Sequence, residues 1–465
     1  MLQQRSFQDK NILILGYGRS GVSAKKILIP FAKNIFVYDK SFLIKILKNK
    51  SKNNLFLNKN NNFNNILTKK QKVVVANNNF LFEENNVFFE NNIQKILKKN
   101  KIHFCVVSPG FDINAKEVRL IKRAGVRLVS ELELGATYCR GKIFAITGTN
   151  GKTTTVNALF HIFKSAKKHC FLCGNVGTPI TEIAPFTTNK SLIVCEVSSF
   201  QMETTKCFSP YASAILNIQP DHLDRHKTMK NYAFQKTKIF GNCKTKKFLN
   251  FDDKITKNLK KKYFNAKYFS LKNKKTLFLI KNNKLLGGFN QSNLLCAASL
   301  AKAAGISNAQ ICEAMKTFMG LPHRLQFVAK HHNISFINDS KSTNIASTLA
   351  ALEAVSGKII LLLGGANKNL CFADIAKKEI FCVIAFGEAK EKILEDFGAA
   401  PHHNNILSAE NFKGAFHLAT KIAQEYEEEI TILLSPACAS FDEFQSYAHR
   451  GTTFENLVQK FVEEN

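Results

Sequence analysis

Short apolar runs alternate with helix-period stretches along most of the chain. The apolar runs predict buried strands, whereas positions such as Val156, Leu159, Phe160 and Phe163 repeat at the spacing of one helix face. Strands that alternate with helices indicate mostly parallel sheets, so the expected fold class is α/β. The predicted strands cover residues 11–15, 35–38, 73–76, 104–107, 143–146, 191–195, 214–218, 334–337, 359–363, 382–386 and 430–434.

The length of 465 residues suggests about three domains, at roughly 150 residues each. We expect a Rossmann-like N-terminal domain over residues 1–141 and a central P-loop domain over residues 142–320. A second Rossmann-like α/β domain should occupy residues 321–465. Residues 48–65 are nearly all Lys and Asn, a composition typical of a solvated, low-complexity loop.

The stretch around which the chain is organised follows the predicted strand at 143–146. Residues 147–154 read Thr-Gly-Thr-Asn-Gly-Lys-Thr-Thr, and a helical pattern follows. Glycines let backbone N–H groups turn onto phosphate oxygens, and the helix start adds partial positive charge. Lys152 would reach the outer phosphates and Thr153 would ligate Mg²⁺. The loop is shorter than a usual P-loop, because Ile146 stands where the first glycine is expected.

A second glycine-rich loop lies near the N-terminus. Gly16, Gly18 and Gly21 form G-x-G-x-x-G between two predicted strands, and Asp39 follows about 20 positions on. This pattern indicates a phosphate-bearing group at a helix N-terminus without saying which one. The turn at residues 108–110 follows another strand, where α/β sheets place ligands.

Further polar residues follow predicted strands. Glu196 ends one strand downstream of the P-loop, a place where a carboxylate commonly holds Mg²⁺. Residues 221–226 carry Asp-His-Leu-Asp-Arg-His after the next strand. In the last third of the chain, residues 338–344, 364–368 and 435–440 each follow a strand, so we expect them to gather on one sheet edge.

The net charge of +31 would ordinarily suggest a nucleic-acid partner. Lysine is spread along the chain rather than clustered, and it accompanies many Asn and Phe residues, so we expect no nucleic-acid binding. The charge would instead attract an anionic, nucleotide-bearing substrate.

No apolar run approaches a membrane span and no signal-peptide pattern occurs, so we expect a cytoplasmic protein without membrane insertion. Twelve cysteines fit a reducing compartment. The C-x-x-C at Cys170 and Cys173 is interpreted as buried thiols, because no second pair lies at zinc spacing.

Taken together, these motifs resemble the Mur ligase family, and in particular its D-glutamate-adding members. The resemblance covers all three expected domains. It rests on the P-loop, Gly174-Asn-Val-Gly, Glu196-Val-Ser-Ser-Phe-Gln, Asp221-His-Leu-Asp-Arg-His, Leu321-Pro-His-Arg, Asn338-Asp-Ser-Lys-Ser-Thr-Asn and Ser435-Pro-Ala-Cys-Ala-Ser-Phe-Asp.

The resemblance implies a reaction in peptidoglycan precursor synthesis. ATP would phosphorylate the carboxylate of UDP-N-acetylmuramoyl-L-alanine to an acyl phosphate, which the amine of D-glutamate attacks to form an amide. Such chemistry depends on phosphate clamping, two Mg²⁺ ions and positioning rather than on a protein nucleophile. A monomer with these small-molecule substrates is expected.

The resemblance also assigns roles to individual residues. Lys152, His222 and a carbamylated Lys236 would be catalytic, and Thr153 and Glu196 would bind one Mg²⁺ while His222 and Lys236 serve the second. The expected ATP site comprises Gly148, Thr149, Asn150, Gly151, Lys152, Thr153, Thr154, Asn290, Asn293, Arg324 and Asp339. The expected UDP-substrate site comprises Gly16, Gly18, Ser108, Gly110, Asn175, Ser198 and His222, with Gly21 in the same loop. The expected D-glutamate site comprises Thr343, Lys368, Ser440, Phe441 and Tyr447.

The chain departs from the family pattern at three places. Lys40 and Ser41 stand where Thr-Arg often holds the uracil ring, which leaves the uracil contacts open. Phe289 replaces a usual His before Asn290. Asn367 and Asn369 flank Lys368, where the family usually has Asp and Gly.

Three alternatives remain open at this stage. A dehydrogenase would use the loop at Gly16 and Asp39 and would give no role to Lys152. A sister ligase for a diamino acid would carry an Asp-Asn-Pro-Arg run, which the sequence lacks, and folylpolyglutamate synthase is a further relative. A basic nucleic-acid-binding ATPase would need clustered Lys and Arg with interleaved aromatic residues.

Overall fold

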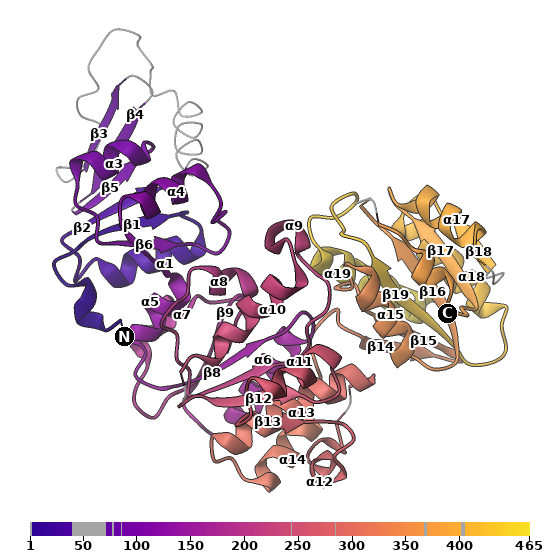
Figure 1. Cartoon of the computed structure of the whole chain (residues 1–465). Helices are drawn as coiled ribbons and strands as arrows, with labels where there is room; N and C mark the ends of the chain where they lie inside the picture. The colour runs from indigo at the N-terminus through magenta and orange to yellow at the C-terminus, as the bar shows by residue number, and fades with distance from the viewer. Residues whose placement is uncertain are drawn as a thin grey trace. The chain divides into compact units, whose positions relative to one another are not determined.

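A computed structural model describes residues 2–39, 71–76, 79–84, 86–242, 244–283, 285–366, 370–400 and 405–465. The chain divides into two compact units, Met1–Asn273 with Cys296–Ile311, and Lys274–Leu295 with Cys312–Asn465. The described residues form three β-sheets of seven, six and six strands, which follow one another along the chain (Figure 1).

The N-terminal sheet has the strand order β3-β4-β5-β2-β1-β6-β7. Its strands from β5 to β7 are parallel, and β3 and β4 extend it by antiparallel pairing. Ile12 and Ile14 pack in a cluster with α1 and α5, whereas Leu13 and Leu15 pack with α3 and α4, so helices cover both faces. The elements are η1 (Gln4–Phe7), β1 (Asn11–Leu15), α1 (Arg19–Leu28), β2 (Asn34–Tyr38), β3 (Gln71–Ala76), β4 (Asn79–Glu84), β5 (Val87–Glu90), α3 (Ile93–Lys99), β6 (Phe104–Val107), α4 (Lys116–Arg123), β7 (Arg127–Ser130) and α5 (Glu131–Tyr138).

The central sheet has the order β13-β12-β11-β8-β10-β9 and is parallel throughout. Phe144 of β8 contacts Phe163 of α6, while its neighbours Ile143 and Ala145 face the cluster that includes α8 and α10. The elements are β8 (Lys142–Thr147), α6 (Lys152–Ser165), β9 (Cys170–Gly174), α7 (Ile180–Ile183), η2 (Ala184–Phe186), β10 (Leu192–Glu196), α8 (Ser199–Glu203), β11 (Ala212–Ile215), α9 (Leu223–His226), α10 (Met229–Thr237), η3 (Lys238–Phe240), β12 (Lys246–Asn250), α11 (Lys254–Asn258), η4 (Leu259–Lys261) and β13 (Lys267–Phe269). After them come α12 (Lys274–Leu277), η5 (Phe278–Ile280), α13 (Gly288–Ala303) and α14 (Asn308–Thr317).

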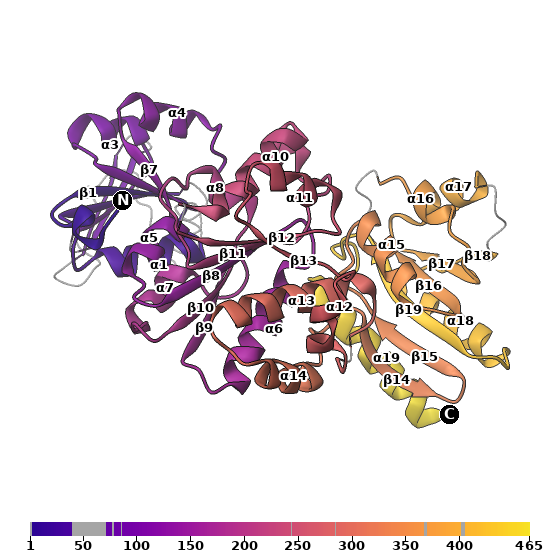
Figure 2. The same ribbon diagram turned by 60° about the horizontal axis from the view of Figure 1, so that its bottom comes forward.

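The C-terminal sheet has the order β14-β15-β19-β16-β17-β18 and is parallel except for β14. Alternate strand residues face α15 to α17 on one side and α18 and α19 on the other (Figure 2). The elements are β14 (Gln326–His331), β15 (Ile334–Asn338), α15 (Ile345–Ala354), β16 (Lys358–Gly364), α16 (Ala373–Ala376), β17 (Cys382–Phe386), α17 (Lys390–Gly398), β18 (Asn405–Ser408), α18 (Phe412–Gln424), β19 (Ile430–Ala437) and α19 (Tyr447–Glu464).

The α/β class and the mostly parallel sheets are confirmed. β15, β16 and β19 run parallel, so the three loops that follow them lie on one sheet edge, as the sequence predicts. The strand predicted at 214–218 is shifted: β11 spans Ala212–Ile215, and the residues after it turn toward the P-loop. The predicted loop at 48–65 lies outside the described residues. In the part of the chain that is described, no helix is long and apolar enough to cross a membrane.

Candidate active site

The P-loop joins the end of β8 to the start of α6. Gly151 adopts φ of +81° and caps α6 without a side chain, so the first turn of this helix has no side-chain cap. The Lys152 ammonium donates to the carbonyl oxygens of Gly148 and Thr149, each at 2.8 Å. The predicted arrangement of strand, glycine loop, lysine and helix is therefore present, and backbone N–H groups at such a helix start favour anions.

The loop after β11 fixes the shape of the P-loop. Asn150 N–H donates to the Asn217 side chain at 2.9 Å, and the Asn217 amide returns a hydrogen bond to the Asn150 carbonyl at 3.1 Å. Thr149 N–H donates to the Asn217 carbonyl, and the Thr149 hydroxyl contacts the backbone of Gln219 on both its N–H and carbonyl sides. A Cβ on Gly148 would lie 3.0 Å from the Leu216 Cβ, so a larger residue there would require the same loop to shift by a few tenths of an ångström.

Lys236 of α10 reaches the same loop from a distant part of the sequence. Its side chain is buried, and its ammonium donates to the Gly148 carbonyl at 2.7 Å. The Tyr232 ring lies 4.5 Å from the Lys236 nitrogen, and the Tyr232 hydroxyl is 3.2 Å from the Thr149 hydroxyl. Burial, together with the nearby Lys152 charge, lowers the pKa of Lys236 well below its ordinary value. A depressed pKa increases the fraction of uncharged amine at neutral pH.

Glu196 ends β10 next to the P-loop strand. It pairs in register with Ile146 of β8 and with Gly174 of β9, and its side chain is buried. One carboxylate oxygen accepts from the Asn175 amide at 3.0 Å, whereas the other has no protein hydrogen-bond partner. An orphaned buried carboxylate oxygen is costly unless a cation or a ligand group meets it. The site therefore fits a divalent cation, with Thr153 of the first α6 turn as the other predicted ligand.

The segment 221–226 carries the remaining catalytic candidate of the central sheet. His222 adopts φ of 53°, caps α9 and has a half-exposed side chain 3.5 Å from the Asp221 carboxylate. Its ring packs against Phe200 with centroids 4.8 Å apart. Among the described residues, no group of three or more His, Cys, Asp or Glu side chains is arranged to hold a metal ion. A second Mg²⁺ site at His222 and Lys236 therefore stays a prediction.

A cavity of about 640 Å³ lies at the carboxyl ends of β1 and β6 and extends to the end of β9. Five residues of the predicted UDP-substrate site line it, namely Gly16, Gly18, Ser108, Gly110 and Asn175. Ser198 and His222 do not line it. The Ser108 hydroxyl donates to the Gly16 carbonyl at 2.8 Å, which fixes the two strand ends together. This position, outside the carboxyl ends of parallel strands, is where α/β sheets bind ligands.

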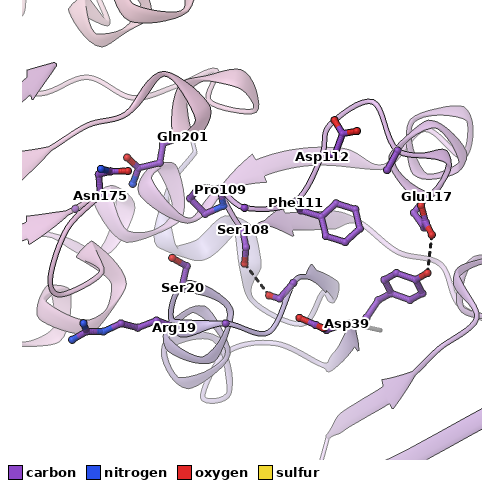
Figure 3. A pocket seen from close by; sticks show the side chains of 16 residues that line it. Arg19, Ser20, Asp39, Ser108, Pro109, Phe111, Asp112, Glu117, Asn175 and Gln201 are labelled. Carbon is purple, nitrogen blue, oxygen red and sulfur yellow. Dashed lines mark hydrogen bonds between the residues drawn. The ribbon is translucent and has the colours of Figure 1, made fainter. Parts of the chain in front are cut away.

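The two ends of the cavity differ in chemistry (Figure 3). Asn175 and Gln201 lie at one end, whereas Phe111, Asp39 and Glu117 lie at the other, with Ser108 between them. Asp39 accepts from the backbone N–H of Tyr17 at 2.6 Å, so it fixes the glycine loop. A long ligand with a phosphate-bearing centre and an aromatic end would place its centre near Ser108 and the glycine loop and its aromatic end near Phe111. Lys40 and Ser41, which bear on uracil recognition, lie outside the described residues.

The second unit holds the other predicted ATP-site residues. Asp339 follows β15 and accepts from Leu325 N–H at 3.2 Å and from the Ser435 hydroxyl at 2.9 Å. Burial raises the pKa of Asp339 to about 7, and Arg324 opposes that shift. Asn290 and Asn293 are buried in α13, and the Asn290 amide donates to the Leu286 carbonyl at 2.8 Å.

The described residues of the predicted D-glutamate site lie at the edge where the three loops meet. Ser440 is buried and follows Ala439, which pairs with Ala366 in an isolated bridge. Phe441 is exposed, and Tyr447 at the start of α19 is in cation–π contact with Lys341 at 4.5 Å. Thr343 is half-buried in the loop after β15. Lys368 lies outside the described residues, as do Asn367 and Asn369.

Arg450 organises this edge and was not predicted from the sequence. Its guanidinium is fully buried and donates to the end of β16 and to the loops that follow β15 and β19. The acceptors are the Ser340 hydroxyl and carbonyl, and the carbonyls of Gly364, Cys438 and Ala439, at 3.0 to 3.5 Å. Burial lowers the pKa of Arg450 to about 10, which still leaves it charged at neutral pH.

Two known protein families match the residues that form most of the central and C-terminal sheets. The family described as Mur ligase middle domain matches residues 146–301, and the family described as Mur ligase, glutamate ligase domain, matches residues 323–438. A protein of Caldanaerobacter subterraneus named UDP-N-acetylmuramoylalanine–D-glutamate ligase is 33% identical, over 97% of this chain and 98% of that protein. The chain belongs to the Mur ligase family.

Other relatives agree with this membership. A protein of the same name from Pelotomaculum thermopropionicum is 37% identical to this Mur ligase, over 77% of the chain and 84% of the relative. Among solved structures, MurF from Acinetobacter baumannii has a TM-score of 0.54 at 17% identity, covering 78% of this chain and 85% of its own. A pseudomurein peptide ligase type C from Methanothermus fervidus has the same TM-score and identity, covering 97% of this chain and 100% of its own. These structures share the fold, and family membership removes the dehydrogenase alternative.

Several residues that shape the site of this Mur ligase were given no role from the sequence. Gln201 lines the cavity and completes a capping box with Ser198 at the start of α8, which a Ser-x-x-Gln spacing could have indicated. Asn217, inside the strand predicted at 214–218, and Gln219, just after it, hold the P-loop but belong to none of the motifs on which the family resemblance rests. Cys170 is half-buried and Cys173 buried, so the interpretation of buried thiols is confirmed for Cys173.

Proposed function

We propose that this chain joins D-glutamate to UDP-N-acetylmuramoyl-L-alanine with ATP, through an acyl phosphate, in cytoplasmic peptidoglycan precursor synthesis. The observation that carries the proposal is the hydrogen bond from Asn175 to Glu196. Asn175 lines the substrate cavity, and Glu196 lies beside the P-loop strand, so one contact joins the nucleotide-sugar cavity to the phosphate site. A reaction between the ATP γ-phosphate and the end of a UDP-sugar needs this adjacency.

The ATP phosphates would lie on the P-loop backbone from Gly148 to Thr154, with Lys152 against the outer phosphates. Glu196 and Thr153 would hold one Mg²⁺, and His222 with Lys236 would serve the second. Bound Mg²⁺ would supply charge neutralisation on the transferring phosphoryl group. Lys152 contributes a fixed cation in the same place, and the loop at Asn217 keeps its backbone aligned.

Lys236 is proposed to be carbamylated. The modification requires an uncharged amine, and burial beside Lys152 lowers the pKa of Lys236 accordingly. A carbamate keeps one N–H, which can still donate to the Gly148 carbonyl that Lys236 now contacts at 2.7 Å. It also replaces one of two neighbouring cations by an anion, which suits a divalent ion.

The UDP-sugar would occupy the cavity between the ends of β1 and β6. Its diphosphate would meet the start of α1, where Gly18 caps the helix without a side chain and leaves room for a close approach. The sugar and L-alanyl end would lie toward Asn175, with Ser198 and His222 along the path to the phosphate site. The base would lie toward Phe111 and Asp39.

The amino acid is proposed to bind to residues 321–465 as a third domain, beside a central domain at 142–320 and an N-terminal domain at 1–141. Each of the three sheets lies within one of these ranges. D-Glutamate carries two carboxylates, so hydroxyl, backbone and cationic donors should surround it. Thr343, Ser440, Phe441, Tyr447 and Lys368 are the proposed contacts, with Asn290, Asn293, Arg324 and Asp339 around the nucleotide.

Phosphate release from ATP tests the proposal. With UDP-N-acetylmuramoyl-L-alanine present, initial rates are compared for D-glutamate, L-glutamate, D-alanine, L-lysine and a diaminopimelate. D-Glutamate should be fastest, because donors built for a distal carboxylate are left unpaired by analogues that lack it. A faster rate with another amino acid contradicts the specificity, and rapid ADP formation without any acceptor contradicts the ligase reaction. We expect a monomer and no sequence-selective nucleic-acid binding.

A further inference from the structure

Arg225 connects two regions that the proposed reaction uses separately. It lies in the short helix α9, three residues after His222, and its side chain is largely buried. Its guanidinium pairs with the buried Glu203 carboxylate, with Nε at 3.2 and 3.1 Å from the two oxygens and Nη2 at 2.5 Å. A planar guanidinium held in this way has a defined orientation.

The same guanidinium donates to the loop that lines the substrate cavity. Nη1 donates to the Pro109 carbonyl at 3.4 Å and Nη2 to the Phe111 carbonyl at 3.1 Å. Both residues line the cavity, and they belong to the β6 side of the N-terminal sheet. Glu203 ends helix α8, which also supplies Gln201 to the cavity. Arg225 therefore contacts one cavity loop directly and a cavity helix through its ion pair.

The Arg225 guanidinium also packs on Phe200, which in turn contacts His222. Its central carbon lies 4.4 Å from the centroid of the Phe200 ring, and that ring packs against His222 at 4.8 Å and against the buried His226 at 5.5 Å. A shift of the Pro109 or Phe111 carbonyl would therefore move Arg225, which packs on the Phe200 ring that His222 contacts. Packed contacts of this kind have few alternative arrangements.

We propose that Arg225 is a positioning residue that couples occupation of the UDP-substrate cavity to the placement of His222, one of the proposed ligands of the second Mg²⁺ ion. The inference rests on the proposed function, since it takes the cavity ligand to be the UDP-sugar. A ligand that orders residues 108–112 favours the arrangement in which Arg225, Phe200 and His222 are stacked. Because coupling is reciprocal, nucleotide bound at the phosphate site raises the affinity of the cavity for its ligand by the same factor.

Binding affinities measured by calorimetry on the full chain test the inference. UDP-N-acetylmuramoyl-L-alanine is titrated with and without a non-hydrolysable ATP analogue and Mg²⁺, and the ratio of the two affinities is the coupling factor. Wild type should show a factor of about fivefold or more, within the range usual for coupled sites. Arg225→Met should bring the factor to within about twofold of one, whereas affinity for the ATP analogue alone should change little.

Arg225→Lys separates positioning from simple folding. Lysine keeps the charge that pairs with Glu203, so the variant should fold normally. Because lysine cannot meet Glu203 and two carbonyls at once, the coupling factor of the variant should be reduced. The KM of the UDP substrate should rise about tenfold, with little change in the KM of D-glutamate. Arg127→Met is the matched control, because Arg127 also pairs with a buried glutamate, Glu133, at 3.4 Å but does not line the cavity. Its coupling factor should equal that of wild type.

The outcomes separate the two proposals. If the UDP substrate does not bind wild type at all, the proposed function fails. If it binds but wild type shows a factor of one, or Arg225→Lys keeps the wild-type factor, the coupling role of Arg225 is overturned while the ligase function stands. Equal loss of coupling in Arg127→Met would also overturn it, since a general effect on packing would then explain both variants.

Discussion

Lys152 and Lys236 donate to the same carbonyl oxygen, that of Gly148, at 2.8 and 2.7 Å. Two ammonium groups on one acceptor repel each other, and the charge of Lys152 is one cause of the depressed pKa of Lys236. The contact therefore places an amine of reduced basicity at the phosphate loop, which is the condition that carbamylation requires. The arrangement links a residue of the P-loop motif to one that is 84 positions away in the sequence.

The first prediction concerns this lysine. Lys236→Ala should lose nearly all ligase activity, because the proposed carbamate serves a Mg²⁺ ion. A short carboxylic acid in the buffer should restore part of the activity by standing in for the carbamate in the space that the side chain leaves. Phosphate release from ATP with both other substrates present measures this.

Lys230→Ala is the matched control, since Lys230 is an exposed lysine of the same helix. It should keep wild-type activity and should not respond to the acid. Full activity of Lys236→Ala, or equal stimulation of both variants by the acid, would contradict the assignment.

The second prediction compares two glycines of one motif. A Cβ on Gly21 would lie 2.0 Å from the Gly16 carbonyl oxygen, whereas a Cβ on Gly18 would meet nothing within 4 Å. Gly21→Ala should therefore push α1 from β1 and destabilise the chain by about 1–3 kcal/mol or more. Gly18→Ala should leave the unfolding transition unchanged. Urea denaturation followed by circular dichroism distinguishes the two, and equal stability of both variants would contradict the role given to the third glycine.

How well the sequence predicts a strand depends in part on where the strand lies in its sheet, although β5 and β12 lie inside their sheets and were also not predicted. Interior strands such as β1 and β16 are buried on both faces, so they are apolar runs that can be recognised. The unpredicted strands include β14, at one edge of the C-terminal sheet, and β18 at the other. β14 reads Gln-Phe-Val-Ala-Lys-His with no fully buried residue, so its pattern does not differ from that of a polar loop.

The site divides in a similar way. Glycine loops and polar residues at strand ends are local signals, and the structure places the P-loop, the cavity-lining Gly16 and Ser108, and the loop at Ser440 after strands, as these signals predict. Arg450 and Arg225 act on backbone carbonyls about 110 residues away, such as Ser340 and Pro109. A carbonyl is present at every residue, so its partner leaves no trace in the sequence. Such contacts can be assigned only once the strands are placed.

The third prediction concerns Arg450. Arg450→Met keeps the length of the side chain but leaves the carbonyls of Ser340 and Cys438 without their donor at 3.0 Å. Because these buried acceptors would be unpaired, the unfolding free energy of this unit should decrease by about 3 kcal/mol or more. Because the loop before Ser440 would loosen, the KM of D-glutamate should rise more than that of the UDP substrate. Lys460→Met, on the exposed side of the same helix, should alter neither.

The last prediction uses the titration of Asp339. Burial raises its pKa to about 7, from an ordinary value of 3.8. In the folded chain Asp339 therefore holds its proton over a pH range in which the unfolded chain has lost it. The native state binds more protons between about pH 4 and 7, so this group stabilises the chain at the acid end and its contribution is lost as the pH rises through that window. Three pKa units correspond to about 4 kcal/mol as an upper bound.

Asp339→Asn removes this dependence while keeping the shape of the side chain. The asparagine carbonyl can still accept from Leu325 N–H, and its amide can donate to the Ser435 hydroxyl, so both of these contacts of Asp339 can be kept. The unfolding free energy of Asp339→Asn relative to wild type should therefore increase between pH 4 and pH 8. Asp374→Asn, at an exposed aspartate paired with Lys377, provides the control and should show no such increase. A difference between Asp339→Asn and wild type that stays constant across this range, or that falls with pH, would show that Asp339 is ionised in the folded chain throughout. The hydrogen bonds from Ser435 and Leu325, together with the Arg324 charge, would then outweigh the burial of the carboxylate.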